Sequence, residues 1–171
     1  MRYTTVDSPV GPLLLARSTV GLAGLTMSPH PHPHPHPHRD GPSEDWSPDP
    51  GGFADVTDQL AAYWAGERQT FDLPLDLRGT AFQQSVWAAL LQIPYGSTTS
   101  YGVIASRLGV PGASRAVGLA NGRNPVSIVV PCHRVVGSTG LLTGYGGGLP
   151  NKRFLLAHEA AHSPDPALTL F

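Results

Sequence analysis

The spacing of apolar residues predicts strands near the start of the chain and helices further on. Apolar clusters separated by glycine and proline predict short strands at residues 3–7 and 13–18, with a third at 22–26. Helical spacing then predicts a helix over residues 53–66, with one apolar stripe formed by Val56, Leu60, Tyr63 and Trp64. The following segment, FDLPLDLRG at residues 71–79, predicts an extended linker.

From residue 80 onward the spacing is helical in successive segments. Thr80 lies three residues before Gln83, which is a capping-box pattern, and an apolar stripe follows in Phe82, Val86, Ala89, Leu90 and Ile93. Ser100 is expected to cap the helix YGVIASRL, and Gly109 is expected to end it in the left-handed conformation. A third helix is predicted for ASRAVGLANG, residues 113–122.

The last part of the chain combines a short apolar run, a glycine-rich loop and one more helix. SIVV, residues 127–130, predicts a buried strand or extended segment that brings Cys132 to a bend. GSTGLLTGYGGG, residues 137–148, predicts a loop. A final helix, KRFLLAHEAA, is expected to begin at Pro150 or Asn151.

These elements predict an α/β protein with two domains. Residues 1–78 are expected to form a small amino-terminal α/β domain with a short sheet, and residues 79–171 a mostly helical domain. Two short helices joined by a tight glycine-containing turn, at residues 100–109 and 113–122, are typical of a helix-turn-helix. Many helix pairs of this kind bind no nucleic acid, so the pattern alone leaves both interpretations open.

A histidine–proline repeat, HPHPHPHPH at residues 30–38, interrupts the first domain. Alternating proline prevents helix formation and strand pairing, so the tract is expected to be extended and polyproline-like. Its five histidines suit loose binding of Ni, Cu or Zn, but no geometry is preorganised, and a neutral insertion is the preferred interpretation. The acidic segment GPSEDWSPDPGG is expected to continue this loop to Gly52.

The charge of the chain is divided between its two parts. Residues 1–78 contain five arginines and ten acidic residues, a balance of −5. Residues 79–162 contain six basic residues and only Glu159 as an acid, a balance of +5. Chance variation of solvated surface is one explanation, and contact of the second part with a polyanion is the other.

Composition narrows the class of protein. The chain of 171 residues is 40% hydrophobic, enough for a globular core, and has no apolar run of membrane-spanning length and no signal-peptide pattern at its start. Its single cysteine cannot form an internal disulfide. We therefore expect a protein of the reducing cytoplasm, without a membrane partner and acting as a monomer.

The single cysteine, Cys132, lies in NPVSIVVPCHRVVG. A lone cysteine is most often a small buried hydrophobic residue. Here a histidine follows it, and nearby basic residues favour the thiolate, which is the attacking form. His133 could accept the thiol proton if Glu159, the only acid of the basic part, sets its proton state; alternatively Glu159 is a helix-surface residue paired with Lys152 or Arg153.

PCHRVV, preceded by NPV and followed by a GYGGG loop and LLAHE, resembles the O6-alkylguanine-DNA alkyltransferases, also called methylated-DNA–protein-cysteine methyltransferases. The segments IPYGSTTSYG and SRAVGLANGRNP are also similar to the DNA-binding half of that family. The resemblance covers residues 79–162, nearly half of the chain, and PCHRV is its most specific part.

The resemblance implies catalytic roles for four residues. Cys132 matches the alkyl acceptor, and His133 matches the base that reaches the thiol through a water. Glu159 matches the group that orients the imidazole. Asn124 matches the amide that ties the active-site turn together.

Five further residues match positions that bind DNA or the target base. Tyr101 resembles the tyrosine that helps to rotate the target phosphate and protonates the departing guanine, and Arg115 the arginine that fills the gap in the base stack. Val135 matches a residue that contributes backbone to the base pocket. The amide of Gly146, after Tyr145, falls where the family binds the guanine oxygen.

The implied activity is repair of double-stranded DNA by stoichiometric transfer of an alkyl group from O6-alkylguanine to Cys132, with O4-alkylthymine as a further candidate substrate. The resemblance implies no metal and no organic cofactor. It also implies that the helix-turn-helix enters the minor groove of DNA. The small residues Ala113, Ala116, Gly118 and Ala120 would allow this close approach. The target guanine would have to leave the base stack to reach the thiol.

Two features depart from the family pattern. A run of glycines, residues 146–148, follows the loop tyrosine where relatives often have a bulkier or hydroxylic residue, which leaves the preferred alkyl size open. Some relatives bind a structural zinc through cysteines of the amino-terminal domain, and residues 1–78 contain no cysteine for such a site.

Two other functions compete with repair. A module that flags alkylated DNA without repairing it would lack the cysteine of the PCHR position, which is present here as Cys132. A cysteine–histidine hydrolase would need an oxyanion hole and would leave the basic helix pair unexplained.

Overall fold

The computed structural model describes residues 1–27, 42 and 45–164, and the described chain forms two compact units. The amino-terminal unit consists of Met1–Arg78 and Pro125–Val129. The carboxy-terminal unit contains Gly79–Asn124 and the chain from Val130 onward. The histidine–proline tract lies outside the described residues.

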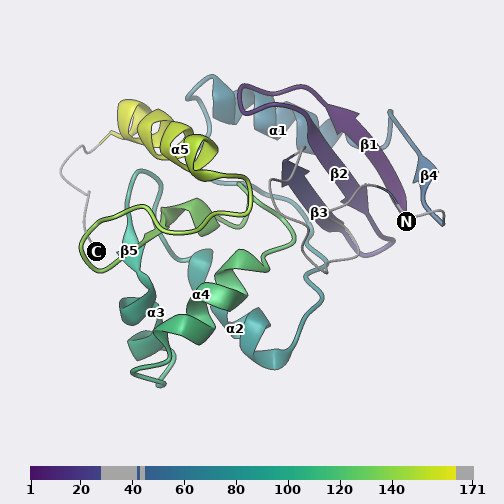
Figure 1. Ribbon diagram of the computed structural model, residues 1–171. Coiled ribbons are helices and arrows are strands. Elements are labelled where there is room, and N and C mark those ends of the chain that lie inside the picture. The colour runs from purple at the N-terminus through teal and green to yellow at the C-terminus, as the bar shows by residue number, and fades with distance from the viewer. Residues whose placement is uncertain (28–41, 43–44, 165–171) are drawn as a thin grey trace. The chain divides into compact units, whose positions relative to one another are not determined.

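The amino-terminal unit is built on a four-stranded sheet with strand order β3-β2-β1-β4 (Figure 1). Its strands are β1 (Arg2–Val6), β2 (Leu13–Arg17), β3 (Leu22–Met27) and β4 (Ser47–Pro48). The first three, which the apolar clusters predicted as strands, form antiparallel pairs. The turn between β1 and β2 contains Gly11 at a φ of 92°, a conformation that glycine adopts without strain.

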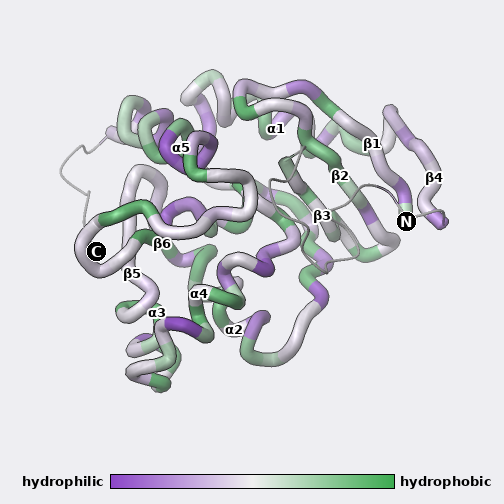
Figure 2. The backbone as a smooth tube through the Cα atoms, viewed as in Figure 1, coloured by the Kyte–Doolittle hydropathy of each residue, from purple (hydrophilic) through white to green (hydrophobic). Residues whose placement is uncertain are grey.

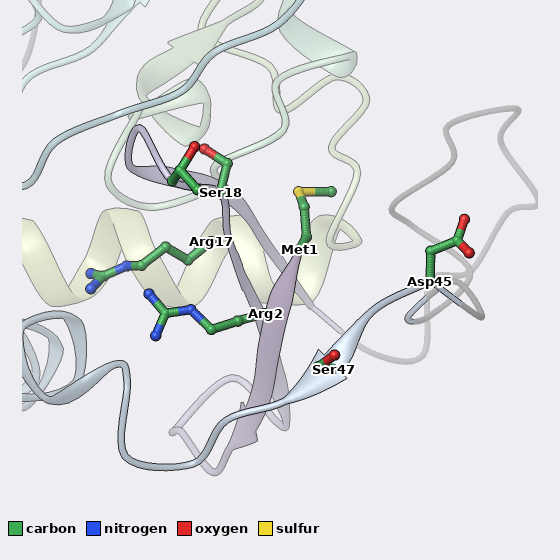
Figure 3. Close-up of a pocket in the computed structure, with 7 residues that line it drawn as sticks. Met1, Arg2, Arg17, Ser18, Asp45 and Ser47 are labelled. Carbon is green, nitrogen blue, oxygen red and sulfur yellow. The ribbon is translucent and has the colours of Figure 1, made fainter.

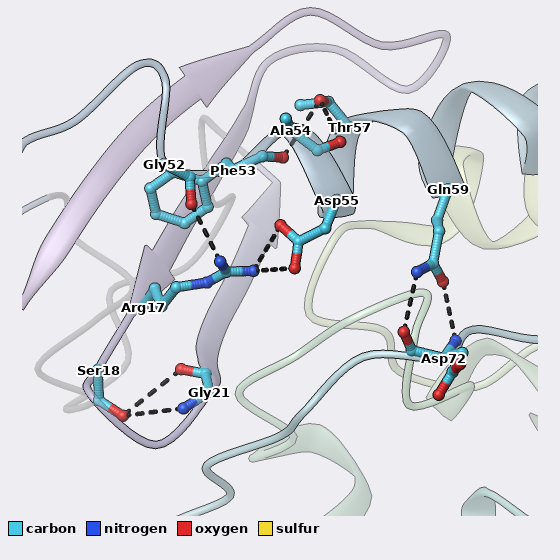
Figure 4. Close-up of polar contacts among 10 residues, drawn as sticks. All are labelled: Arg17, Ser18, Gly21, Gly52, Phe53, Ala54, Asp55, Thr57, Gln59 and Asp72. Carbon is cyan, nitrogen blue, oxygen red and sulfur yellow. Dashed lines mark hydrogen bonds and ion pairs between the residues drawn. The ribbon is translucent and has the colours of Figure 1, made fainter.

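The helix α1 (Ala54–Trp64) completes the amino-terminal unit. Its predicted stripe is buried at Val56, Leu60 and Tyr63 and half-buried at Trp64, and β2 and β3 contribute most of the sheet's buried hydrophobic residues (Figure 2). Arg17, at the end of β2, joins sheet and helix because its guanidinium donates to both carboxylate oxygens of Asp55 and to the Gly52 carbonyl (Figure 4).

Two segments that were not predicted to be strands pair with the sheet. Ser47–Pro48 lies in the acidic segment assigned to a loop, yet it pairs in parallel with β1, and Trp46 is buried against Leu14 and Ala16. The linker at 71–79 is extended as predicted, and Leu75 forms a bridge with Leu22 of β3. The sequence did not predict β4, because the segment is rich in proline and has no alternating strand pattern. Burial of one tryptophan holds this segment at the sheet.

The prediction of a strand at residues 127–130 is wrong. The segment is buried as expected, but it forms turns, and Ile128 has a φ of 71°, which is rare for a β-branched residue. Only Val126, just before it, forms a bridge, to Leu25 of β3. The apolar run therefore reflects burial rather than strand pairing.

The carboxy-terminal unit is mostly helical. Its elements are α2 (Ala81–Leu90), β5 (Thr99–Ser100), α3 (Tyr101–Arg107), α4 (Ser114–Gly122), a 3-10 helix (Cys132–Arg134), β6 (Val135–Val136) and α5 (Leu149–His162). The capping box of Thr80 and Gln83 is present, and Ser100 caps α3 by accepting from the Val103 amide. Gly109 ends α3 with a φ of 73°, as predicted.

The helix α4 packs against both α2 and α3 (Figure 1). Trp87, which the predicted apolar stripe of α2 missed, is 1% exposed and donates its indole N–H to the Ala120 carbonyl of α4. Together these elements confirm the predicted fold class, a small amino-terminal sheet followed by a mostly helical part. Within the described residues, no helix has the length and apolar content needed to cross a membrane.

Candidate active site

Cys132 lies at the first position of the 3-10 helix and is 4% exposed. It follows turns rather than the expected strand. The side-chain amides of two buried asparagines, one in α4 and one just after it, hold the backbone around Cys132. Asn124 donates to the Val130 carbonyl at 2.8 Å, and Asn121 donates to the Cys132 carbonyl at 3.4 Å. The tight 3-10 turn fixes the backbone at the thiol.

His133 is fully buried and bonded to Glu159 of α5. Its Nε2 lies 2.6 Å from Glu159 Oε1, and both side chains have no exposed surface. This contact requires the 3-10 helix and α5 to pack together, which they do. The alternative in which Glu159 pairs with Lys152 or Arg153 at the surface of the helix is therefore wrong.

Arg134 provides the second partner of Glu159. Its Nε donates to Oε2 at 2.8 Å and its Nη2 to Oε1 at 3.0 Å, while Nη1 donates to the Ile93 carbonyl at 2.6 Å. The Gly96 amide also donates to Oε2, at 3.1 Å. Burial alone would raise the pKa of Glu159, but His133 and Arg134 outweigh it and hold the pKa below its usual value, so Glu159 is a carboxylate.

The ionised carboxylate determines the tautomer of His133. Burial lowers the pKa of His133, against the opposing effect of Glu159, so the imidazole is neutral near pH 7. Because a carboxylate only accepts hydrogen bonds, Nε2 must carry the ring proton and act as the hydrogen-bond donor to Glu159. The lone pair is then on Nδ1, which is buried and has no hydrogen-bond partner among the described residues.

Lys152 is a buried cation that sequence reasoning left on the surface. It has no exposed surface, and its Nζ donates to the carbonyls of Val135 at 2.6 Å and Thr143 at 3.0 Å. Burial lowers the pKa of Lys152 to about 8, while the electrostatic influence of Cys132 raises it. The ammonium is therefore still mostly protonated near pH 7.

Tyr101, Val135 and the loop at 137–148 meet around Lys152. Tyr101 begins α3, and its hydroxyl donates to the same Thr143 carbonyl at 3.4 Å. Burial raises the pKa of Tyr101, so the hydroxyl keeps its proton near neutral pH. Val135, in β6, is fully buried and offers its carbonyl to Lys152.

The loop at 137–148 is irregular, as predicted, and carries the two remaining residues that are predicted to contact the base. Tyr145 and Gly146 are half-buried, and the Tyr145 carbonyl accepts from the Gly148 amide at 2.9 Å. Gly148 has a φ of 85° and precedes α5, which begins at Leu149, one residue before the expected start.

Arg115 stands apart from the buried cluster. It lies near the start of α4 and is exposed. Of the small residues expected to face a minor groove, Ala116 is exposed, but Ala120 is buried and Gly118 lies against the Tyr101 ring. Ala120 is therefore not available to contact a groove, and contact through the other small residues stays a prediction.

The amino-terminal unit has a hollow that contains none of these residues (Figure 3). Arg2 and Arg17 reach its edge, but both are paired, with Asp49 and Asp55. Within the described residues, no three histidine, cysteine or carboxylate side chains gather as metal ligands.

Comparison with known proteins places this arrangement in a family. Residues 81–161 match the family model for the DNA-binding domain of 6-O-methylguanine DNA methyltransferase, and residues 1–77 match the model for its ribonuclease-like domain. The chain belongs to the 6-O-methylguanine DNA methyltransferase family. The match extends beyond the motifs around Cys132 to the amino-terminal part, which the sequence resembled only in outline.

Close relatives of this family member are named as methyltransferases. The methylated-DNA–protein-cysteine methyltransferase of Mycobacterium tuberculosis is 55% identical over 171 residues, covering 100% of this chain and 99% of the relative. The Mycobacterium leprae protein of the same name is 53% identical over 167 residues, covering 98% and 96%. The crystal structure of Mycobacterium tuberculosis OGT in complex with DNA gives a TM-score of 0.86 at 54% identity and covers 96% of each chain.

Three residues of the buried cluster escaped the sequence analysis. Arg134 and Lys152 were counted only among the basic residues of the second part, without a place in the site, and Gly96 only as a helix stop. For Lys152 a signal existed, because it shares one helical side with Leu155 and Glu159 at spacings of three and seven residues. For Arg134 the sequence carried no such signal. A 3-10 turn has no apolar periodicity from which the direction of the Arg134 side chain could be predicted.

Proposed function

We propose that this protein repairs DNA by transferring an alkyl group from the O6 atom of guanine to Cys132, once per protein molecule. The observation that supports this most is the buried Cys132–His133–Glu159 arrangement, in which a neutral histidine presents an unpartnered Nδ1 beside the thiol-bearing residue. Membership of the family and the names of its close relatives support the same reaction.

In the proposed reaction His133 Nδ1 accepts the proton of the Cys132 thiol through a water molecule. Glu159 stabilises the imidazolium that forms, and Arg134 keeps that carboxylate in place. The Lys152 ammonium stabilises the thiolate. The sulfur then attacks the alkyl carbon, a carbon–sulfur bond forms, and the carbon–oxygen bond breaks with its electron pair going to guanine.

Departing guanine gains a proton that balances the one lost by the thiol. Tyr101 is the proposed donor, because the family resemblance assigns it this role and its hydroxyl is a hydrogen-bond donor at the Thr143 carbonyl. The imidazolium of His133 then returns the thiol proton through solvent to the tyrosinate, so both side chains end neutral. The hydroxyl would exchange its bond to the Thr143 carbonyl for one to the base. The Gly146 amide is proposed to bind the guanine oxygen, with Val135 and Tyr145 beside the base and Asn124 holding the turn.

The proposed substrate is double-stranded DNA in the cytoplasm, with O4-alkylthymine as a further candidate base. Helices α3 and α4 would act as a helix-turn-helix, with α4 in the minor groove. The guanine would have to leave the stack, at a cost of a few kcal/mol. Arg115 would fill the gap and offset part of that cost. We also propose residues 1–78 and 79–171 as the two folding domains.

The reaction is tested by incubating the protein with a duplex that contains O6-methylguanine and measuring both products. We expect unmodified guanine in the DNA and a protein heavier by one methylene unit, because a methyl group replaces the thiol hydrogen. DNA binding without any mass change would instead indicate a flagging module. Cleavage of acyl substrates without a stable adduct would indicate a hydrolase.

Arg115→Ala is expected to impair base extrusion more than general DNA affinity, because Arg115 is exposed at the start of α4. The measurement compares transfer from methylated duplex with transfer from free benzylguanine base. We expect the duplex rate to fall about tenfold relative to the free-base rate. An unchanged duplex-to-base ratio would contradict the proposed role.

Lys152→Met is expected to slow transfer near pH 7 about tenfold, which corresponds to about 1.4 kcal/mol. The buried ammonium interacts with Cys132, and its removal leaves less thiolate at a given pH. Single-turnover rates measured from pH 6 to 9 should show the rate rising at higher pH in the variant than in the wild type. Arg153, an exposed basic residue of the same helix, provides the matched control. Arg153→Met should leave the pH profile unchanged.

A further inference from the structure

The exposed face of α4 carries a leucine between two arginines. Arg115, Leu119 and Arg123 are spaced by four residues, so they form one stripe along the helix and its C-cap. All three are exposed, and Leu119 keeps 59% of its surface in contact with solvent. The stripe extends about 12 Å along the helix axis, because eight residue-to-residue steps separate its ends and each rises about 1.5 Å.

The two arginines of this stripe are not neutralised by any described residue of their unit. In the described part of the carboxy-terminal unit the only acidic residue is Glu159, which is buried and bonded to His133 and Arg134. No ion pair joins Arg115 or Arg123 to a described residue. The stripe therefore presents positive charge at both ends and an apolar surface at its centre, which suits a polyanion with apolar edges between its phosphates.

We propose that Leu119 is an apolar wedge that contacts the sugar and base edges of the DNA minor groove, one helical turn beyond Arg115. This inference rests on the proposed function. An α-helix is about 10–12 Å wide with its side chains, whereas the minor groove of B-DNA is about 6 Å wide. The groove must therefore open to admit α4, and apolar wedges are a common means of holding it open.

The proposal assigns different roles to the two kinds of residue in the stripe. Arg123 contacts a phosphate and so contributes to the salt dependence of binding, by about 0.9 in the slope of log affinity against log salt concentration. Leu119 carries no charge, so it contributes affinity and leaves that slope unchanged. Alanine is also the better helix former, so a loss of affinity in Leu119→Ala cannot come from weakening of α4.

The test is the binding of an unmodified duplex at several salt concentrations, followed by single-turnover repair. Leu119→Ala is expected to weaken binding about fivefold to tenfold at every salt concentration, with an unchanged slope. Arg123→Ala is expected to reduce the slope by about one. Leu119→Met, which conserves volume, should restore binding. The control is Leu91→Ala, which removes another exposed leucine, 43% exposed at the end of α2, and should change neither quantity.

Wild-type affinity in Leu119→Ala, or a loss equal to that in Leu91→Ala, would overturn the proposal. A loss of self-association in Leu119→Ala without DNA, with DNA affinity unchanged, would also overturn it and assign the stripe to a second copy of the chain. These outcomes are separate from failure of the proposed function, which would appear as a wild-type protein that gains no alkyl mass from methylated duplex while still binding DNA.

Discussion

Titration of the protein with an excess of methylguanine duplex is expected to stop at about one methyl group per active molecule. Peptide mapping should find the methyl group only on the peptide that contains Cys132. Cys132→Ser should accept none, because a serine hydroxyl has no comparable tendency to ionise near neutral pH. This is the largest effect that we predict, a complete loss of acceptance from the change of one atom.

The plateau follows from the chemistry of the product. A thiol can resolve a disulfide because it attacks sulfur and releases a thiolate, but a thioether contains no sulfur–sulfur bond. The chain also has no second cysteine to attempt such a step. Repair of many equivalents of DNA, with unmodified protein recovered afterwards, would contradict single use and make Cys132 a true catalyst.

Burial of Cys132 contributes to its selectivity. The residue is 4% exposed, Asn121 donates to its own carbonyl, and Asn124 donates to the carbonyl of Val130, two residues before it. A small alkylating reagent in solution should therefore react slowly compared with an extruded base that is bound beside the thiol. The measurement compares the rate at which free methyl iodide modifies Cys132 in the wild-type protein with the same rate in Asn124→Ala. A faster reaction in the variant would show that this turn protects the sulfur.

Helices with polar caps were predictable from the sequence because their signals are local. Thr80 with Gln83, and Ser100 before α3, satisfy orphan amides within one turn, and the structure has both caps. Gly109 was predictable for the same reason, since only its own backbone conformation is involved. The strands β1 to β3 followed from apolar clusters separated by turn residues.

Segments fixed by distant contacts were not predictable in this way. Ser47–Pro48 becomes a strand because Trp46 is buried against β2 residues about thirty positions earlier. The apolar run at residues 127–130 is buried without pairing as a strand, because Ile128 takes a left-handed turn. An apolar run indicates burial, and only the surrounding structure determines whether the backbone is extended.

In the candidate site, too, some residues were predictable from the sequence and others depend on distant contacts. The resemblance to a known family supplied Cys132, His133 and Glu159, and the structure brings the last two together at 2.6 Å. Arg134 and Lys152 were absent from the prediction, because burial of a charged side chain depends on partners from other segments. Arg134 depends on Ile93 and Glu159, and Lys152 on two carbonyls of separate segments.

Acidification is expected to destabilise the native protein through two of these groups. The pKa of His133 is lowered in the folded protein, so below about pH 6.5 the unfolded chain binds the proton more readily and stability falls. The pKa of Glu159 is also lowered, so its contribution is present above about pH 4.5 and is lost as the pH falls further. Both groups therefore act in the same direction at low pH.

Glu159→Gln is expected to slow alkyl transfer on the order of 100-fold at pH 7, the usual range for loss of general-base assistance, while DNA binding stays nearly intact. The wild-type carboxylate accepts from His133 Nε2 and leaves Nδ1 as the proton acceptor. A neutral amide stabilises the imidazolium less, so less proton passes from the thiol to His133 and less thiolate forms.

The dependence of this deficit on pH separates a chemical role of Glu159 from a structural one. In the variant the thiol must lose its proton to solvent, so transfer should accelerate as the pH rises toward the range where an ordinary thiol ionises, near about 8.5. The wild-type rate should vary less over that range, because His133 takes the proton internally. Single-turnover rates from pH 6 to 9 should therefore converge at high pH. Glu67→Gln, an exposed glutamate of the amino-terminal unit, is the matched control.

A deficit that is equal at every pH would show that Glu159 acts only by holding the structure together. That outcome has a physical basis, because removal of one partner from a buried ion pair typically costs about 3–5 kcal/mol, and Arg134 would lose its carboxylate. The free energy of unfolding of Glu159→Gln must therefore be measured with the rates, below the temperature at which the variant begins to unfold. Superimposable wild-type and variant profiles would remove Glu159 from the mechanism, because a group that sets the proton acceptor cannot be neutralised without changing the rate.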